Sequence, residues 1–467
     1  MPRDTLAALW KDVTGTDVGT VAFEGDEHPL PGPYRVTEAA AACVGAVTLA
    51  ASELVRERGG HDRPITVHIG HAAEAFRSEA HLQVAGETDR DLWAPLSGDY
   101  EAADGWVRLH ANYPHHADAI LRALGADAGG VRDAVARRTA VDIENAVLAA
   151  GGAAAAMRDR DGWLTDGPGA AVRAEPLVAI ERIGDAPPRR LDKSRAERML
   201  AEQFLFDRAS PGHLLAVWTL IERALTGVRV LDLTHVIAGP VATRTLAAHG
   251  AEVLHVTDPK RPVLDRLLMD TGFGKRACHI DADTAEGNET LTALAARADV
   301  FVQSYRPDSL ARKGFGAYQL AAANPGIVVV DLAAYGHTGP WRGRRGFDSL
   351  VQMSCGIAAD QGMDRPRPLP VQALDHATGW LAALGVVTAL RRRATEGGSW
   401  LVRLSLARTA EWLHDLGRDT TQAMPVDPTP LLAGTDSDYG RLTHLRVPGA
   451  LLPLAGPHRP GQDPATW

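Results

Sequence analysis

Short apolar runs in the second half of the chain alternate with stretches of helical periodicity. The runs are rich in valine, isoleucine and leucine, which is typical of strands buried on both faces of a sheet. We predict strands at residues 228–233, 252–256, 300–303 and 327–332, and helices at 241–248, 285–298 and 308–313. Strands that alternate with helices predict an α/β fold with a Rossmann-like parallel sheet, whose ligands bind at the carboxyl ends of the strands.

The first half of the chain is richer in helical patterns. We predict helices at residues 5–13, 36–58, 115–124, 131–138 and 140–150, and strands at 65–69 and 105–110. This mixture indicates a smaller α+β domain within residues 1–190. Two prolines at 187–188 precede a charged helical stretch, so we assign 191–226 to a helical linker and 227–467 to the Rossmann-like domain with a C-terminal tail.

One helical pattern occurs twice. Gly-Ala-Val-Thr at 45–48 corresponds to Gly-Val-Val-Thr at 385–388. Each copy continues with a basic helix end, a Gly-Gly pair, a short strand and an Ala-Glu pair. Ten residues before the first glycine, the first copy has Arg35 and the second has Asp375. The two copies therefore share a scaffold, but only the second carries an acid at this place.

Asp375 stands directly before the apolar helical pattern at 376–390. An acid there is a good N-cap, because its carboxylate accepts the first free backbone N–H groups of a helix. The alternative is a covalent nucleophile held at the helix N-terminus. A cap is expected in both copies of the repeat, whereas Arg35 is a poor cap, although Thr37 can substitute for it. This comparison favours the nucleophile.

Charge and composition exclude some classes of protein. The net charge of −9 argues against nucleic acid as a general partner and gives no reason for attraction to a membrane. No stretch reaches the roughly 20 apolar residues that span a bilayer, and the N-terminus lacks the apolar core of a signal peptide. The three cysteines, Cys43, Cys278 and Cys355, lie far apart, so we expect reduced thiols in a cytoplasmic protein.

Three loops in the second half combine small residues with cations or acids. They span residues 235–240, 304–307 together with Lys275 and 312–313, and 335–348. Backbone N–H groups and arginine forks suit phosphate, but such segments also occur as ordinary turns and solvated basic faces. Asp348 in the third loop is either a second acid near Asp375 or a helix cap. The sequence contains no Walker A pattern, no Ser-His-Asp set and no metal-ligand spacing.

Taken together, these segments resemble the family III CoA-transferases, which include formyl-CoA and carnitine-CoA transferases and 2-methylacyl-CoA racemases. The resemblance rests on motifs in the family's order, at 225–240, 274–276, 304–307, 324–325, 335–340, 346–348 and the helix that follows Asp375. It implies an enzyme that moves CoA between an acyl-CoA and a carboxylic acid, with CoA as part of the substrate and no metal.

The resemblance also implies roles for single residues. Asp375 matches the family's nucleophile, which forms an aspartyl-CoA thioester, and Asp348 matches a second active-site acid. The residues that match the CoA-binding surface are Val236, Ile237, Ala238, Lys275, Ser304, Tyr305, Arg312 and Arg345. Phe347 replaces the histidine that serves the racemases as a base, so the resemblance favours transfer over racemization.

The order of the parts is unusual for this family. Residues 1–190 resemble a partial, degenerate copy that includes the small domain, and 227–467 resemble the opening part of a second copy. We therefore expect the family fold in a rearranged, duplicated order, as a homodimer or as a pseudo-dimer within one chain. Two alternatives remain: an acyl-CoA racemase or isomerase, and a catalytically inactive CoA-binding partner subunit.

Overall fold

A parallel sheet forms the centre of the protein. The computed structural model describes residues 1–26, 28–61, 63–86, 93–165, 167–190, 223–419 and 422–467. Within these ranges the largest sheet has seven strands. In spatial order they are β10 (Lys275–His279), β9 (Glu252–Thr257), β8 (Arg229–Leu233), β11 (Val300–Gln303), β12 (Val328–Ala333), β13 (Ser399–Ser405) and β7 (Ala179–Gly184). All pairings are parallel except that of β7 with β13.

The order of the strands places a ligand site. Numbered along the chain from β8, the parallel strands follow the order 3-2-1-4-5-6 of doubly wound folds. The order reverses between β8 and β11, and a crevice forms where the loops after these strands diverge. The predicted α/β fold with a parallel sheet is therefore confirmed, and its switch point coincides with the loops singled out above.

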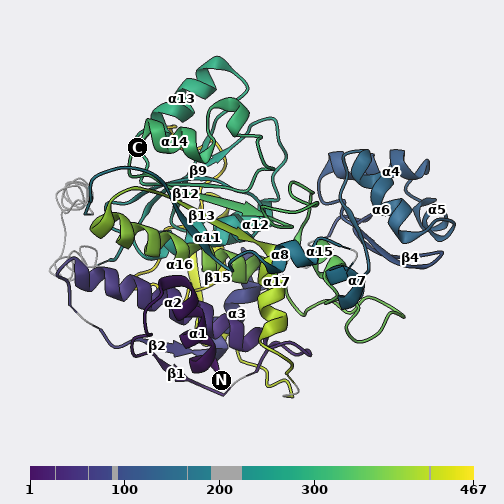
Figure 1. Ribbon diagram of the computed structural model, residues 1–467, viewed down its shortest axis with the longest axis horizontal. Helices are drawn as coiled ribbons and strands as arrows, with labels where there is room; N and C mark the ends of the chain where they lie inside the picture. The colour runs from purple at the N-terminus through teal and green to yellow at the C-terminus, as the bar shows by residue number, and fades with distance from the viewer. Residues whose placement is uncertain (27, 62, 87–92, 166, 191–222, 420–421) are drawn as a thin grey trace.

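Helices cover both faces of this sheet, as Figure 1 shows. Successive residues of β8 pack into different cores: Val230 lies in the larger apolar cluster and Leu231 in the smaller one. The larger cluster contains side chains of α11 (Ala238–Ala248), α16 (Ala373–Glu396) and α2 (Val36–Glu57), whereas the smaller contains those of α13 (Ala285–Ala295) and α14 (Ala317–Ala323). This alternation is the two-residue period of a strand buried on both faces.

Two strands of the sheet were not predicted. β10 contains only two apolar residues, Ala277 and Cys278, between the cations Lys275 and Arg276 and the exposed His279, so no apolar run marked it as a strand. β7 has a partly polar sequence, as an antiparallel strand at the edge of the sheet can have. Because β7 lies before residue 190, the sheet takes strands from both sides of the predicted domain boundary. Residues 191–222, most of the predicted linker, lie outside the described residues.

The two longest helices belong to the core. α2 and α16 are long and apolar enough to span a membrane by composition, so the prediction that no stretch reaches this length was wrong. In their most apolar windows, 72% and 100% of the residues are buried, and the two helices pack against each other. This burial is typical of core helices of a globular protein.

The small domain projects from one side of the molecule, at the right of Figure 1. It contains β4 (Gly98–Ala102), β5 (Gly105–Leu109), α4 (Pro114–Leu124), α5 (Val131–Ala136), α6 (Ala140–Ala149) and β6 (Ala154–Ala156). Its strands form an antiparallel sheet in the order β4-β5-β6. The predicted α+β domain is therefore present, and α7 (Arg160–Thr165) and α8 (Gly169–Arg173) connect it to the edge strand β7.

The N-terminal segment packs beneath α16. It contains α1 (Pro2–Thr14), β1 (Ala22–Glu24), β2 (Thr66–His68), α3 (Ile69–Glu74), the 3₁₀ helix η1 (Ala75–His81) and β3 (Gln83–Val84). β3 joins a hairpin of β14 (Leu432–Ser437) and β15 (Gly440–Leu445), so the two ends of the chain share a sheet. The other short elements are α12 (Asp265–Thr271), η2 (Ala311–Lys313), α15 (Asp348–Ser354), α17 (Leu406–Asp415) and η3 (Thr429–Leu431).

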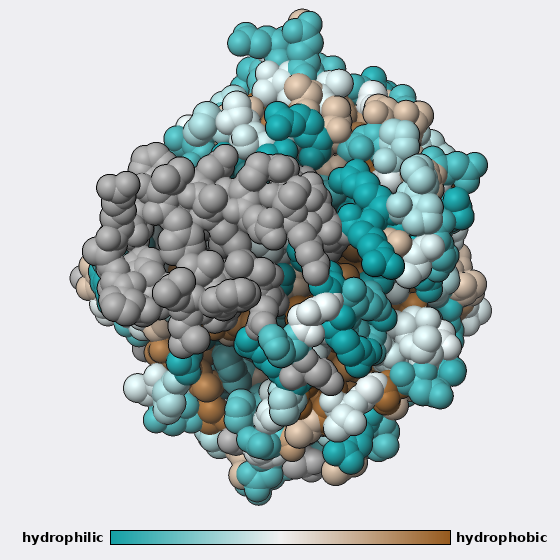
Figure 2. Space-filling model, turned by 90° about the vertical axis from the view of Figure 1, so that its left-hand side faces the viewer, coloured by the Kyte–Doolittle hydropathy of each residue, from teal (hydrophilic) through white to brown (hydrophobic). Residues whose placement is uncertain are grey.

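Large apolar side chains that reach the surface are scattered. They are Met1, Val141, Tyr318, Met363, Met424 and Leu451. On the face shown in Figure 2, the described side chains are mostly hydrophilic and the apolar ones lie in small groups. Isolated exposed apolar residues are normal for a globular protein.

Candidate active site

A cavity of about 1000 Å³ opens at the carboxyl ends of the parallel strands. Its walls come from the loops after β8, β9, β11 and β12 and from the small domain. The lining segments are residues 113–116, 259–262, 304–307, 332–335 and 343–347, together with Asp118, His235, Val236, Ala238, Gly239, Asp375 and Leu406. Residues from both halves of one chain therefore enclose the cavity, at the switch point of the sheet.

Asp375 contributes its side chain to the cavity wall. It is the third residue of α16, not the residue before the helix, because α16 begins at Ala373 with Gln372 as its N-cap. Only 7% of Asp375 is exposed. The predicted N-cap interpretation is therefore wrong, and the carboxylate is not needed to start its own helix.

Burial makes the ionised form of Asp375 costly. The pKa of its carboxyl lies well above the usual value, first because of burial and then because of the negative charges of Asp348 and Glu79. The backbone N–H of Ala238 acts in the opposite direction by hydrogen bonding to the carboxylate. A poorly solvated carboxylate beside a donor N–H is a strong base and nucleophile once it is ionised.

The loop after β8 brings the backbone up to this carboxylate. Val236 has φ of 71°, a left-handed conformation that is rare for a β-branched residue and is found most often at functional sites. At Gly239, a Cβ atom would lie 2.3 Å from the Cβ of Thr234. The small residue thus lets the first turn of α11 lie close to β8 and present its free N–H groups to the cavity.

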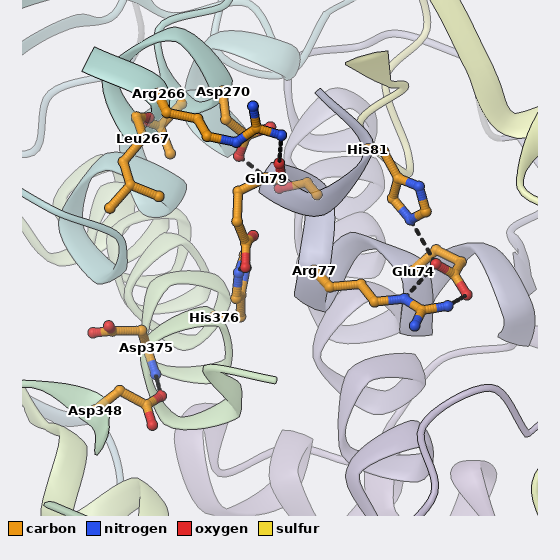
Figure 3. Close-up of polar contacts among 12 residues, drawn as sticks. Glu74, Arg77, Glu79, His81, Arg266, Leu267, Asp270, Asp348, Asp375 and His376 are labelled. Atoms are coloured by element: carbon orange, nitrogen blue, oxygen red, sulfur yellow. Dashed lines mark hydrogen bonds and ion pairs between the residues drawn. The ribbon is translucent and has the colours of Figure 1, made fainter. Parts of the chain in front are cut away.

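Asp348 accepts a hydrogen bond from the backbone of Asp375. Its Oδ2 accepts the backbone N–H of Asp375 at 2.8 Å, and its Oδ1 accepts a bond from Nε2 of Gln352 at 2.5 Å. Asp348 is 1% exposed, and burial raises the pKa of its carboxyl to about 6. The residue thus holds the N-terminus of α16, as Figure 3 shows, and does not line the cavity. Asp348 was predicted to be a second acid near Asp375 or a cap of its own helix, and neither prediction included its hydrogen bond to the backbone of α16.

The structure brings most of the predicted CoA-binding residues to the cavity. Those that line it are Val236, Ala238, Ser304, Tyr305 and Arg345. Three others do not line it. Ile237 is buried at the N-cap of α11, and Arg312 is exposed on η2. Lys275 is 4% exposed, with Nζ bonded to Thr243, Asp232 and the carbonyl of Pro240 at 2.7, 3.1 and 3.0 Å. Lys275 therefore links the end of β8 to the start of α11, on either side of the loop between them.

Two further cations at the cavity, Lys260 and Arg261, escaped the sequence analysis, whereas Arg306 belongs to the predicted segment 304–307. Lys260 and Arg261 follow β9 and, with Arg306, are exposed at the wall. The guanidinium of Arg261 lies 5.5 Å from the ring centroid of Tyr305, whose hydroxyl lies 3.1 Å from Nε2 of His235. A position five residues after a predicted strand was the available signal for Arg261. This grouping of cations around an aromatic ring suits a polyphosphate with an attached base.

The small domain supplies an aromatic wall that no sequence signal indicated. His110 stacks on Phe347, with ring centroids 3.7 Å apart and an angle of 2° between the planes. His116 also contacts Phe347, and burial lowers its pKa to about 4, so it is neutral near pH 7. Phe347 is thereby held at the junction of the two halves of the chain. Across the described residues, no cluster of three or more His, Cys, Asp or Glu side chains is placed to hold a metal ion.

Comparison with known proteins shows what the second half of the chain is similar to. Residues 225–429 match the model of CoA-transferase family III. This region of the chain is therefore similar to the family III CoA-transferases. The acetyl-coenzyme A transferase nodX of Hypoxylon pulicicidum is 36% identical over 200 residues, which cover 41% of this chain and 34% of that protein. An acyl-CoA transferase of Gibberella moniliformis is 28% identical over 441 residues, which cover 83% and 72%.

The second alignment has a further consequence for the first half. Residues 225–429 cannot supply 83% of the chain, so the resemblance to the Gibberella protein includes part of the first half. Among solved structures, Rv3272 from Mycobacterium tuberculosis is 30% identical, with a TM-score of 0.38, and the match covers 41% of this chain and 57% of that one. The chain thus covers less than two thirds of the length of nodX and of Rv3272.

Proposed function

We propose that the protein is a CoA-transferase that moves CoA between an acyl-CoA and a carboxylic acid, with Asp375 as the covalent nucleophile. One observation carries this proposal: the Asp375 carboxylate lies in the wall of a cavity of about 1000 Å³ that is rimmed with cations. The volume suits a ligand larger than most metabolites. The cations suit the phosphates of CoA, and the N–H of Ala238 suits the charge at the reacting end.

The chemistry that this site supports has four steps. The Asp375 carboxylate attacks the thioester carbonyl, a C–O bond forms, and the C–S bond breaks to release CoA thiolate. The thiolate then attacks the Asp375 carbonyl of the mixed anhydride, which gives the aspartyl-CoA thioester and the donor's carboxylate. An incoming carboxylate attacks the thioester and again releases the thiolate, which collects the new acyl group and restores Asp375. Because the charge shifts between oxygens and sulfur, fixed N–H donors stabilise it without reorganisation.

Phe347 favours transfer over racemization. Racemization of an acyl-CoA needs two bases that face the alpha carbon. Phe347 occupies the place of one of them in the motif, and its ring stacks flat on His110. A phenyl ring carries no base. Transfer needs only a nucleophile and apolar walls around the acyl group.

Trapping the covalent intermediate tests the proposal. Wild type, Asp375→Asn and Asp118→Asn are incubated with a set of acyl-CoA donors and treated with hydroxylamine, and the peptides are analysed by mass spectrometry. Asp118 is the matched control, because its carboxylate lines the same cavity but is exposed. We expect a hydroxamate on Asp375 in wild type and in Asp118→Asn, and neither adduct nor CoA transfer in Asp375→Asn. Transfer by Asp375→Asn at the wild-type rate contradicts the proposed function.

A further inference from the structure

The residue after the nucleophile connects the site to the other half of the chain. His376 is fully buried, and its Nε2 lies 3.1 Å from Oε2 of Glu79 on η1. Its ring stacks on Phe76, with centroids 5.7 Å apart. As Figure 3 shows, Asp375 and His376 project from the first turn of α16 in different directions, Asp375 beside Asp348 and His376 onto Glu79. A buried histidine–glutamate contact thus joins the N-terminal segment to the turn that bears the nucleophile.

The carboxylate of Glu79 is ionised in this environment. Burial alone would raise its pKa, but the charge of His376 and their hydrogen bond outweigh burial, so the pKa lies below its usual value. The guanidinium of Arg244 on α11 also acts on Glu79 and lowers its pKa further. The charged groups that face Asp375 are Asp348 on α15 and Glu79 on η1. Glu79 is therefore a permanent negative charge close to the nucleophile, placed there by a different half of the chain.

This inference rests on the proposed function of Asp375. We propose that Glu79 is a positioning residue for the nucleophile: through His376 it fixes the first turn of α16, and with it Asp375, against the N-terminal half of the chain. Removing one partner of a buried pair releases the other and loosens the element that bears it. The charge has a second effect, because a nearby negative group disfavours ionisation of Asp375. Loss of positioning should lower kcat, whereas loss of the negative charge should lower the pKa of Asp375, so the two effects can be measured separately.

Glu74 provides a matched control on the same segment. It is fully buried, and its Oε2 lies 2.6 Å from Nε2 of His81, while Arg77 bonds it at 2.5 Å. Glu74→Gln therefore breaks a buried His–Glu pair of the same kind five residues away. Glu74 is not among the charged groups that act on Asp375. If these buried pairs only stabilise the fold, Glu79→Gln and Glu74→Gln should affect Asp375 equally. If Glu79 acts on the nucleophile, only Glu79→Gln should change the titration of Asp375.

The experiment follows the ionisation of Asp375 in wild type, Glu79→Gln, Glu79→Asp and Glu74→Gln. The carboxyl of Asp375 is titrated by NMR with ¹³C-carboxyl aspartate, and Asp375→Asn assigns its signal. The pH dependence of kcat/KM is measured in parallel. Only the carboxylate is a nucleophile, so activity falls as the pH drops through the pKa of Asp375. Since Glu79→Gln removes a charge that raises this pKa, we expect the titration and the acidic limb to move down by about one pH unit.

The other variants separate geometry from charge. Glu79→Asp keeps the charge but shortens the reach to His376, so we expect a wild-type acidic limb and a kcat lowered roughly tenfold through loss of positioning. Glu74→Gln should leave the titration and the limb unchanged. An unchanged titration in Glu79→Gln, or an equal shift in Glu74→Gln, overturns the inference. Because the NMR titration needs no turnover, a wild type without transfer activity refutes the proposed function while the titration still decides the coupling.

Discussion

A single added methyl group tests whether the contact between α16 and α11 sets the activity. Gly379 lies four residues after Asp375, so both are on the face of α16 that meets the start of α11. A Cβ atom at Gly379 would lie 2.6 Å from the carbonyl oxygen of Ala238 and 2.8 Å from the Cβ of Val241. Gly379→Ala therefore pushes directly on Ala238, the residue whose N–H faces the Asp375 carboxylate.

The geometry fixes the size of the effect. The distance to the Ala238 oxygen is 0.8 Å shorter than the 3.4 Å at which ordinary contact begins, and neither neighbour is the end of a flexible side chain. We therefore expect α16 and α11 to separate by close to this amount. Overpacking costs about 1–3 kcal/mol, while alanine gains about 1 kcal/mol of helix propensity over glycine, which leaves a net loss of up to about 2 kcal/mol.

A displacement of this size matters more for catalysis than for stability. Misplacing a reacting group by about 1 Å costs about 100-fold in rate. Gly385→Ala is the matched control in the same helix, because its Cβ would meet Val402 Cγ1 at 2.6 Å and Val178 Cγ1 at 3.0 Å, away from Ala238. We expect similar losses of stability in urea denaturation for both variants, and a fall in kcat of about 100-fold for Gly379→Ala alone.

The assay measures CoA transfer under single-turnover conditions, so that the step that forms the aspartyl adduct is observed directly. Two results refute the reasoning. One is wild-type adduct formation in Gly379→Ala. The other is an equal loss of activity in Gly385→Ala, since the activity would then follow the general packing of α16 and not the distance between Asp375 and Ala238.

Two further predictions concern groups around the cavity. Asp348→Asn should reduce the pH dependence of the unfolding free energy. Burial raises the pKa of the Asp348 carboxyl to about 6, so the wild type gains stability as the pH falls from about 6 toward the lower pKa that this carboxyl has in the unfolded chain. The amide of the variant does not titrate and lacks this gain. Urea denaturation at several pH values measures the difference. Arg261→Ala should raise KM for acyl-CoA roughly tenfold with kcat unchanged, as expected for a lost charged contact, whereas Arg312→Ala, whose side chain is outside the cavity wall, should leave KM unchanged.

Local patterns determine much of this fold, and they were visible in the sequence. The four predicted strands of the parallel sheet and the two long core helices are present. Their continuous apolar runs can be buried only as strands or helices of the core, so the sequence predicts them. Asp375 was found because a repeat supplied an internal comparison with Arg35. β7 and β10 were missed because tertiary pairing, not local sequence, makes them strands.

The partners of Asp375 could not be predicted in the same way. Asp348 bonds the backbone of a helix that begins 25 residues later, and Glu79 meets His376 across 297 residues of sequence. No periodicity encodes such contacts, because they depend on how separate helices pack. Lys275 shows the opposite error: a cation beside a predicted strand end was assigned to a ligand, yet its ammonium is bonded inside the protein to Asp232 and Thr243.

The repeat explains why the site needs both halves of the chain. α2 and α16 pack against each other, yet among the described residues the first copy's strand β2 pairs only with β1, whereas the second copy's β13 joins the large sheet. Among the residues that the structure describes, the first copy's own strands form only a two-stranded sheet, and Arg35 stands at its helix start. What it supplies instead are Glu79 and the small domain with Tyr113 and His116. Since one chain provides both Asp375 and the cavity wall, the proposed mechanism predicts one covalent adduct per chain, formed at a rate per chain that does not depend on protein concentration.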